Sequence, residues 1–412
     1  MKKRTIARLS AFLTVFFLAV ASAASLDFGL SLTNDSDYLY EGDWSLVQAN
    51  EAHVWLAVPF GSSNALYVSG LYEFQGTFNS TTSTLVPWRL DLGRTEFEGL
   101  LEGFLGSSSV FRYSVGRIAV EDFSNRVMSN LIDGFRAELS LNNFSIYLGA
   151  GYRGLTYKED ARSLIDEDDQ TAYEDSSVYF APKRVMANLG FRLNELVQGH
   201  DFGLEAWGQY DLESAGKQTH TAYVEPFFEG RFGRLFRWRG WCVAEFGYDG
   251  EFFKSVAAGG TVRLSIPEII GFRVTGNVAW ASGTNENFRY FAPIRQKQIV
   301  TVAAYPFSDI LLTSLDLSAS PLRRVTVGAT GSALFRTTTN APSSDALTKA
   351  TVRTETSGYY LGFEPTARVA WQAAADLSFH LSGGVFIPNT VDIYTTDSPL
   401  RWKASINAAF NL

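Results

Sequence analysis

The chain has 412 residues, of which 46% are hydrophobic, 14% aromatic and 19% charged, with one cysteine, Cys242. A single cysteine excludes an internal disulfide framework and a cysteine-rich metal site. The mean hydropathy of -0.02 excludes a helical membrane protein, because each helical span needs about 20 consecutive apolar residues. The net charge of -8 disfavours phosphate-backbone binding, so we expect no nucleic-acid partner.

The N-terminus has the pattern of a secretory signal peptide. Lys2, Lys3 and Arg4 precede an apolar core from Leu9 to Val20, and the small residues 21–23 follow. We predict a signal peptide over residues 1–23 and a mature chain over 24–412, which is more acidic than the whole. A transmembrane helix is the alternative, but the core is too short and wrongly flanked for one.

Alternation of apolar with polar or small residues dominates the mature chain. The C-terminus is the clearest case, since Trp402, Ile406 and Phe410 alternate with Lys403, Asn407 and their neighbours. The same pattern predicts strands over 26–32, 52–58, 66–74, 88–97, 110–118, 134–141, 144–152, 185–193, 202–212, 220–228, 236–248, 256–266, 272–280, 311–319, 325–335, 359–371, 377–387 and 400–412.

The connections between these segments alternate in length. Short turns separate longer polar segments, which we expect to be loops over 33–50, 75–87, 121–133, 156–180, 283–298, 337–357 and 389–399. Short turns on one rim and long loops on the other are typical of an outer-membrane barrel. We predict an all-β fold: a single closed antiparallel transmembrane β-barrel of about 18 strands (range 16 to 20), with short periplasmic turns and long extracellular loops.

A soluble β-sandwich would also alternate, but its strands are usually shorter, nearer 5 or 6 residues. Here many alternations persist further, and aromatic residues such as Trp280, Trp371 and Trp402 often close them. Aromatic residues at strand ends are expected at the two lipid interfaces of a barrel. The pattern therefore favours the membrane barrel.

Two local features resemble the outer-membrane porins of Gram-negative-type bacteria, a class that includes barrels of 16 to 18 strands. Residues 402–412 are similar to the C-terminal strand that barrel-assembly machinery recognises, although Phe410 stands two residues before the final Leu412. Residues 115–135 look like a porin strand that runs into a folded-in loop and returns. The resemblance implies outer-membrane lipids, small polar solutes and the assembly machinery as partners, with a homotrimer as a possible assembly.

Along each predicted strand, the apolar residues occupy every second position, which we call the lipid phase. Charged residues concentrate at the positions between them, which face the lumen in a barrel. Arginine or lysine on the lipid face would cost about 2 to 4 kcal/mol at the midplane, so these charged positions indicate a wet interior. Our candidate pore-lining residues are Arg112, Arg136, Glu138, Arg153, Arg192, Glu205, Arg237, Arg239, Glu245, Arg263, Arg273, Glu364 and Arg368. They either create a field across the pore or pair across strands and stiffen the wall.

The loop over 121–133 is the candidate constriction. Its charged residues, which would set charge preference if the loop folds inward, are Glu121, Asp122, Arg126 and Asp133. Arg94 and Arg117 fall on the lipid phase, so we expect a bulge or an interfacial position at each. The sequence leaves open whether this loop folds inward or outward.

The inward aromatic residues, the acidic run and the histidines do not indicate a catalytic or metal-binding site. Inward aromatic residues, such as Trp207 and Phe227, are expected to pack in the interior rather than bind sugars. The acidic run over 159–175 is expected to be a solvated loop, and the four histidines have no zinc-type spacing. We expect no enzyme activity, no metal and no cofactor.

The sequence thus predicts an outer-membrane porin that forms a water-filled channel for passive diffusion of small polar solutes and ions. A substrate-selective transporter for a sugar or hydrophobic compound is one alternative. A surface adhesin or structural barrel is the other.

Overall fold

The alternating segments form strands in a computed structural model that describes residues 26–213, 218–339, 353 and 357–412. The predicted signal peptide lies outside these residues. The strands are β1 (Asp27–Glu41), β2 (Trp44–Phe60), β3 (Asn64–Asn79), β4 (Ser83–Glu102), β5 (Ser109–Glu121), β6 (Ser129–Leu141), β7 (Phe144–Tyr152), β8 (Arg184–Val197), β9 (His200–Asp211), β10 (His220–Phe232), β11 (Phe236–Tyr248), β12 (Phe252–Ile266), β13 (Phe272–Ala281), β14 (Ile310–Leu322), β15 (Val325–Arg336), β16 (Tyr360–Gln372), β17 (Leu377–Pro388) and β18 (Arg401–Asn411). Each predicted segment overlaps one of them, in order.

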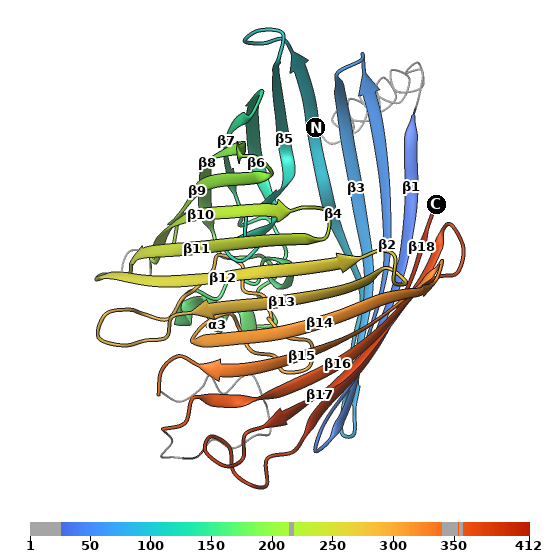
Figure 1. The fold of residues 1–412 in the computed structure, drawn as a ribbon, viewed down its shortest axis with the longest axis vertical. Coiled ribbons are helices and arrows are strands. Elements are labelled where there is room, and N and C mark those ends of the chain that lie inside the picture. The colour runs from blue at the N-terminus through green and yellow to red at the C-terminus, as the bar shows by residue number, and fades with distance from the viewer. Residues whose placement is uncertain (1–25, 214–217, 340–352, 354–356) are drawn as a thin grey trace, which may run out of the picture.

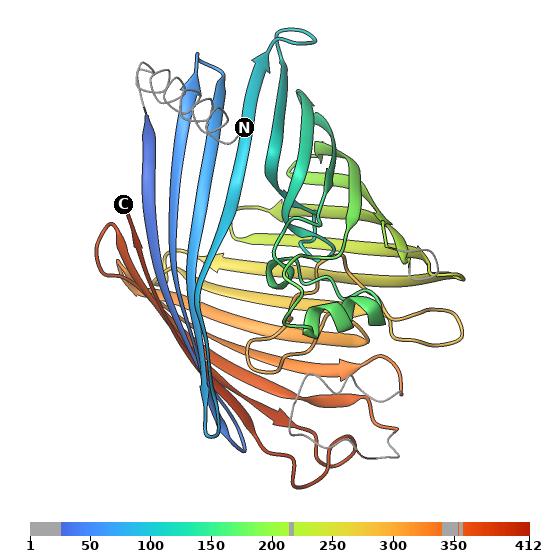
Figure 2. The ribbon, with the colours of Figure 1, turned by 180° about the vertical axis from the view of Figure 1, so that it is seen from behind.

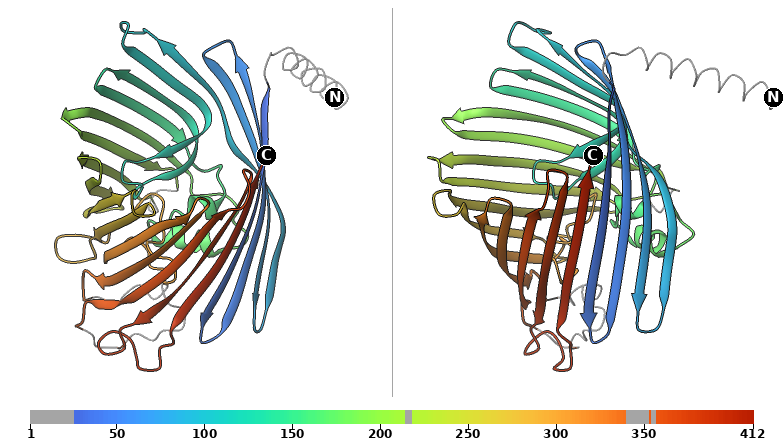
Figure 3. Two further views of the ribbon diagram at one scale, coloured as in Figure 1. Left: turned by 45° about the vertical axis from the view of Figure 1, so that its right-hand side comes forward. Right: turned by 90° about the vertical axis from the view of Figure 1, so that its right-hand side faces the viewer.

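The 18 strands close into one antiparallel barrel, in which β1 pairs with both β2 and β18 (Figures 1 and 3). At the closing seam Leu32 lies opposite Phe410, and Lys403 forms an ion pair of 2.8 Å with Asp37. Closure removes every free sheet edge except where pairing stops locally. The predicted fold class is therefore confirmed.

Two of the predicted loops are wrong. Residues 33–50 and 75–87 are mostly strand, because β1 runs to Glu41, β2 begins at Trp44, and β3 and β4 leave only residues 80–82 between them. The polar residues there pair across strands, as in the 2.7 Å hydrogen bond from Asn34 to Asn50. Figure 2 shows β3 and β4 continuing past the level of α3. The polar residues here lie on strands, and a sequence alone does not distinguish such polar strand ends from loops.

The long connections that remain are 153–183, 282–309 and 389–400, whereas most of the predicted loop over 337–357 lies outside the described residues. The first contains two short helices, α2 (Lys158–Ala161) and α3 (Glu167–Glu174). No helix among the described residues is long and apolar enough to cross a membrane.

The outer face of the barrel is apolar. Val54, Leu90 and Leu189 are all more than half exposed, as lipid-facing positions would be. Tyr38 and Tyr40 lie against Trp402 at ring-centroid distances of 5.1 and 5.6 Å, which gives part of an aromatic girdle. These features match the predicted membrane barrel.

The buried core lies inside the barrel, where two inward loops pack against the wall. Met128 from the β5–β6 connection, and Phe291 and Phe307 from the 282–309 loop, share a cluster with the wall residues Trp207 and Tyr223. Inward aromatic residues on the wall are thus packed, as the sequence suggested. The loops narrow the lumen and leave its remaining wall to polar side chains.

Candidate functional site: the channel interior

The β5–β6 hairpin leaves the barrel wall halfway along its length. β5 pairs with β4 only as far as Arg117, opposite Thr95, and β6 pairs with β7 only from Asp133 onward. Beyond these points, residues 118–132 pair only with each other, and Ile118 and Ile132 are buried in the interior cluster. The candidate constriction loop therefore folds inward.

The bend is fixed by Gly116 and Arg117. Gly116 has φ of 130°, and a Cβ there would overlap the Thr95 carbonyl oxygen, so only glycine fits. Arg117 donates two hydrogen bonds to Asp133, of 2.9 and 3.0 Å. At Arg94 the register between β3 and β4 shifts between Val68 and Gly70. The bulge expected at Arg94 is present, whereas at Arg117 the pairing with β4 ends without a register shift.

Asp122 shapes the tip of the inward hairpin. Its carboxylate accepts hydrogen bonds from the backbone amides of Arg126 and Val127 at 3.1 and 3.0 Å, and from the Ser124 hydroxyl at 2.7 Å. The Arg126 guanidinium lies over the Phe307 ring, 5.3 Å from its centroid, and burial lowers the pKa of Arg126. Asp133 stays at the wall with Arg117, whereas Glu121 is exposed and bonds to the Asn125 side chain.

Three glutamates on the barrel wall hold the inward loops by accepting hydrogen bonds from backbone amides of those loops. Glu205 accepts a hydrogen bond of 3.1 Å from Phe123 N, and Glu245 accepts one of 3.0 Å from Ala292 N. Glu364 accepts three, from the amides of residues 301, 302 and 303, at 2.8, 3.1 and 2.8 Å. All three glutamates face inward, but they are at most 1% exposed because the loops cover them.

Arg153 is likewise covered. It is fully buried and donates hydrogen bonds to the carbonyls of Ile294, at 2.6 Å, and Ala161. Arg153 therefore links two inward loops: the 153–183 loop, which contains α2 and α3, and the 282–309 loop. Of the candidate pore-lining residues, these four serve as loop anchors rather than as surfaces that a solute can touch.

The remaining candidates lie on the open inner wall and are mostly arginines. Arg112 and Arg136 lie on either side of Glu138, each 3.8 Å from it. Arg192 pairs with Asp201 at 2.6 Å and Arg368 with Asp316 at 2.6 Å. Arg239 pairs with Glu229 at 3.2 Å, and Arg273 is exposed.

Three inward arginines lie in one row across adjacent strands near the short-turn rim. Arg231 lies opposite Arg237, and Arg237 lies opposite Arg263. Within the described part of the chain no carboxylate forms an ion pair with any of them. They line a cavity of about 790 Å³. Like charges directly opposite each other are destabilising, so this row lowers the stability of the barrel, and the fold itself does not require it.

The opposite wall carries three inward carboxylates, two of which are ion-paired. Glu51 on β2 lies opposite Glu73 on β3; Glu73 pairs with Arg89 at 3.0 Å, and Asp37 on β1 pairs with Lys403 at 2.8 Å. In a ring of 18 strands, β2 and β3 lie nine strands from β11 and β12, which carry the arginine row. The sequence prediction missed Arg231 and Glu51; alternation within the correct strand bounds would have found both.

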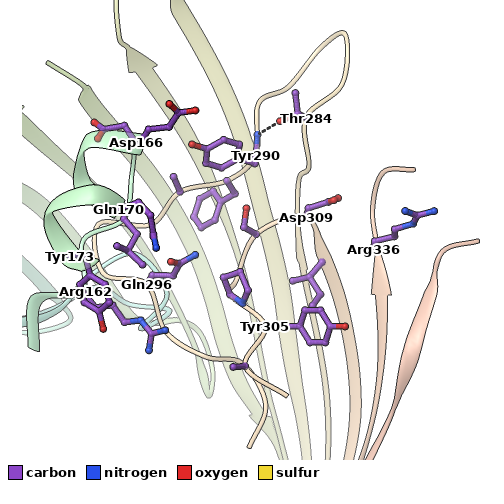
Figure 4. Close-up of a pocket in the computed structure, with 18 of the residues that line it drawn as sticks. Arg162, Asp166, Gln170, Tyr173, Thr284, Tyr290, Gln296, Tyr305, Asp309 and Arg336 are labelled. Carbon is purple, nitrogen blue, oxygen red and sulfur yellow. Dashed lines mark hydrogen bonds between the residues drawn. The ribbon is translucent and has the colours of Figure 1, made fainter. Parts of the chain in front are cut away.

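A second cavity, of about 660 Å³, lies between α3 and the 282–309 loop (Figure 4). Arg162, Gln170, Tyr290 and Asp309 are among the residues that line it. Tyr290 is fixed by a hydrogen bond of 3.2 Å from its amide to the Thr284 hydroxyl. The cavity has lining groups of both charges at the long-loop side of the lumen.

The acidic run over 159–175 is only partly a solvated loop. Glu167 and Asp168 are exposed, but Asp169 is 5% exposed and pairs with Arg184 at 2.9 Å. The prediction fails at Asp169 because α3 turns that side chain inward onto the wall. No group of three or more possible metal ligands occurs among the described residues.

A closed barrel with an apolar outer face, a charged interior and loops folded into that interior has the architecture of an outer-membrane porin. Comparison with solved structures agrees. The outer membrane protein opdK from Pseudomonas aeruginosa matches with a TM-score of 0.61 at 11% identity, over 94% of this chain and 98% of that one. OccK2 (OpdF) and OccK7 (OpdD) of the same organism match with TM-scores of 0.59 and 0.58 at 11% and 10% identity. These two matches cover 94% of this chain and 98% and 99% of theirs.

At these identities the likeness concerns the fold, and the expected porin-like barrel fold is confirmed. No family model matches the sequence. No curated protein is significantly similar to it.

Proposed function

We propose that the protein is an outer-membrane channel for small polar solutes, with a preference for anions. The observation that carries this proposal is the row Arg231, Arg237 and Arg263, none of which forms an ion pair within the described part of the chain, although Asp201 and Glu229 line the same cavity. Fixed positive charge along a narrow aqueous path attracts anions and repels cations. Glu51 on the wall across the lumen adds a transverse field that would orient dipolar solutes.

Passive diffusion and substrate selection remain separate possibilities within this proposal. The buried inward aromatic residues Trp207, Tyr223 and Phe227 support diffusion over sugar binding, because the loops cover the rings that would stack on a sugar. The cavity beside α3 supports some selection at the long-loop side, since its lining carries both charges.

The same proposal includes export and assembly. Residues 1–23 would direct export, and β18 would present the assembly signal, while the apolar outer face would contact lipid.

Planar-bilayer recording of the purified protein tests the channel. We expect stable ion-conducting steps from wild-type protein. A folded barrel that inserts without conducting would refute the channel and favour a structural or adhesive role.

A further inference from the structure

One stretch of the barrel wall lacks a backbone ladder. Residues 83–94 of β4 pair with β3 on one side, but their other edge has no strand partner because β5 leaves the wall after Arg117. The segment that lies there instead is 153–160, which follows β7 and contacts Arg89 through Asp160 and Tyr157. No backbone hydrogen bond joins these two segments, both of which the structure describes. We call the boundary between residues 83–94 and residues 153–160 the lateral seam.

Two arginines bridge the lateral seam. Arg89 of β4 lies 3.2 Å from Asp160 and 4.3 Å from the centre of the Tyr157 ring. Arg117 donates to the Leu92 carbonyl at 2.8 Å on one side and to the Leu155 carbonyl at 3.1 Å on the other. Side-chain contacts thus hold the two segments together here, whereas backbone hydrogen bonds join neighbouring strands elsewhere in the wall. Such side-chain contacts can break one at a time.

The far edge of the 153–160 segment is tied down. Lys158 N donates to the Tyr179 carbonyl and Ala181 N to the Thr156 carbonyl, each at 3.0 Å, which extends the β7–β8 pairing. Opening of the seam would therefore swing this two-stranded extension away from β4 rather than unfold it.

The outside of the lateral seam is apolar. Leu155 and Phe180 are 50% and 51% exposed, next to the exposed lipid-facing residues Leu90 and Leu92 of β4. The inside is polar, because the Asp160 side chain that pairs with Arg89 there is 47% exposed. A chamber of about 640 Å³ that includes Arg112 and Arg136 begins beside the seam at Arg94. The seam therefore separates polar side chains from lipid by the thickness of one loop segment.

An unpaired strand edge at membrane depth is costly unless protein covers it or it lines a wet cavity. We propose that the lateral seam is a side passage through which amphipathic molecules, with a carboxylate head and an apolar tail, move between the lumen and the outer leaflet. The arginines at the seam could exchange their present carboxylate partners, Asp160 and Asp133, for the head group. The apolar tail would leave the water along Leu155 and Phe180.

The test cross-links the seam and compares two carboxylates that differ in tail length. Arg89 and Tyr157 are replaced by cysteine in a Cys242→Ala background and joined by a short bis-methanethiosulfonate, which a reductant removes. A matched pair at Val262 and Gly276, which face each other on β12 and β13, is joined in the same way. Uptake of radiolabelled dodecanoate and butyrate is measured in Gram-negative cells that carry each protein.

We expect the seam cross-link to reduce dodecanoate uptake to the level of cells without the protein and to leave butyrate uptake unchanged. The reductant should restore dodecanoate uptake, and the matched pair should affect neither acid. Dodecanoate uptake that persists in the cross-linked protein would overturn the proposal, as would equal loss of both acids, which would place the segment in the main path.

The variant Arg89→Ala gives an independent result that does not depend on cysteine chemistry. It removes one of the two bridges, so dodecanoate uptake should rise while butyrate uptake stays the same; an unchanged dodecanoate rate would count against the passage. If butyrate enters through none of the variants, that result would contradict the main channel proposed above. The dodecanoate result would still show whether the lateral seam is a passage.

Discussion

The backbone amide of Phe123, at the tip of an inward hairpin, donates a hydrogen bond of 3.1 Å to the carboxylate of Glu205 on the barrel wall. Glu205 also accepts a bond of 3.1 Å from the Asn188 side chain and is fully buried. This contact holds the constriction in the lumen. The size of the pore therefore depends on a wall residue that a solute does not touch.

Replacement of Glu205 by alanine should release the hairpin tip. The change leaves the Phe123 amide without its acceptor, at a cost of about 1 to 3 kcal/mol to the docked position. We expect larger single-channel conductance with frequent flicker in planar bilayers. Glu138→Ala is the control, since Glu138 also faces inward but holds no loop amide. Equal conductance of Glu205→Ala and wild type would show that the tip is held by other contacts.

Glu364 should matter more for stability, because it holds three consecutive amides of the 282–309 loop. Glu364→Ala is expected to lower the free energy of unfolding by on the order of 3 kcal/mol, as several buried donors lose a charged acceptor. Urea unfolding in lipid vesicles measures this. Glu364→Gln keeps a carbonyl acceptor and should lose less. An unchanged midpoint for the alanine variant would contradict the anchoring role.

The segment around α3 should become less stable as pH rises. Burial raises the pKa of Asp169 from 3.8 to about 6, despite Arg184 nearby. Between these values the folded segment holds a proton that the unfolded segment has lost, so this contribution to stability is complete below about pH 4 and falls as pH rises through about 6.

Hydrogen exchange of the α3 amides, corrected for intrinsic rates, measures this dependence. Protection should decrease from pH 4 to pH 7, and Asp169→Asn should flatten the profile. Protection that increases over this range would show that the ion pair with Arg184 outweighs burial.

Arg112 and Arg136 lie beside the chamber that the hairpin bounds. Arg112→Glu or Arg136→Glu should shift ion selectivity toward cations, because each reverses a charge beside the path. The ratio of anion to cation permeability in a salt gradient is the measurement. Arg234→Glu, in the exposed turn between β10 and β11, is the control. Unchanged selectivity in both lumen variants would remove these arginines from the ion path.

Most of the fold follows from alternation, because one face of every strand must suit lipid. The pairing of β18 with β1 and β17 keeps the apolar phase read from Trp402 to Phe410. The strand predictions are wrong where polar residues interrupt the alternation of apolar and polar positions. Residues 33–50 include several consecutive polar residues, from Thr33 to Asp37, so the sequence predicts a loop where β1 and β2 continue.

The site could be predicted only in part. Phase places Glu205, Glu245 and Glu364 inward, but whether a loop covers them depends on contacts between residues far apart in the chain, such as Glu364 and Val302. Alternation carries no information on such contacts. By contrast, the bulge at Arg94 could be predicted, since a charge among the lipid-facing positions requires a local departure from the regular pleat.

The preference for anions is the central claim, and the zero-current potential of wild-type protein in a potassium chloride gradient tests it most directly. Chloride should be more permeant than potassium, with a sign that reverses in the double variant Arg237→Glu/Arg263→Glu. A wild-type potential that shows potassium as the more permeant ion would contradict the role assigned to the arginine row.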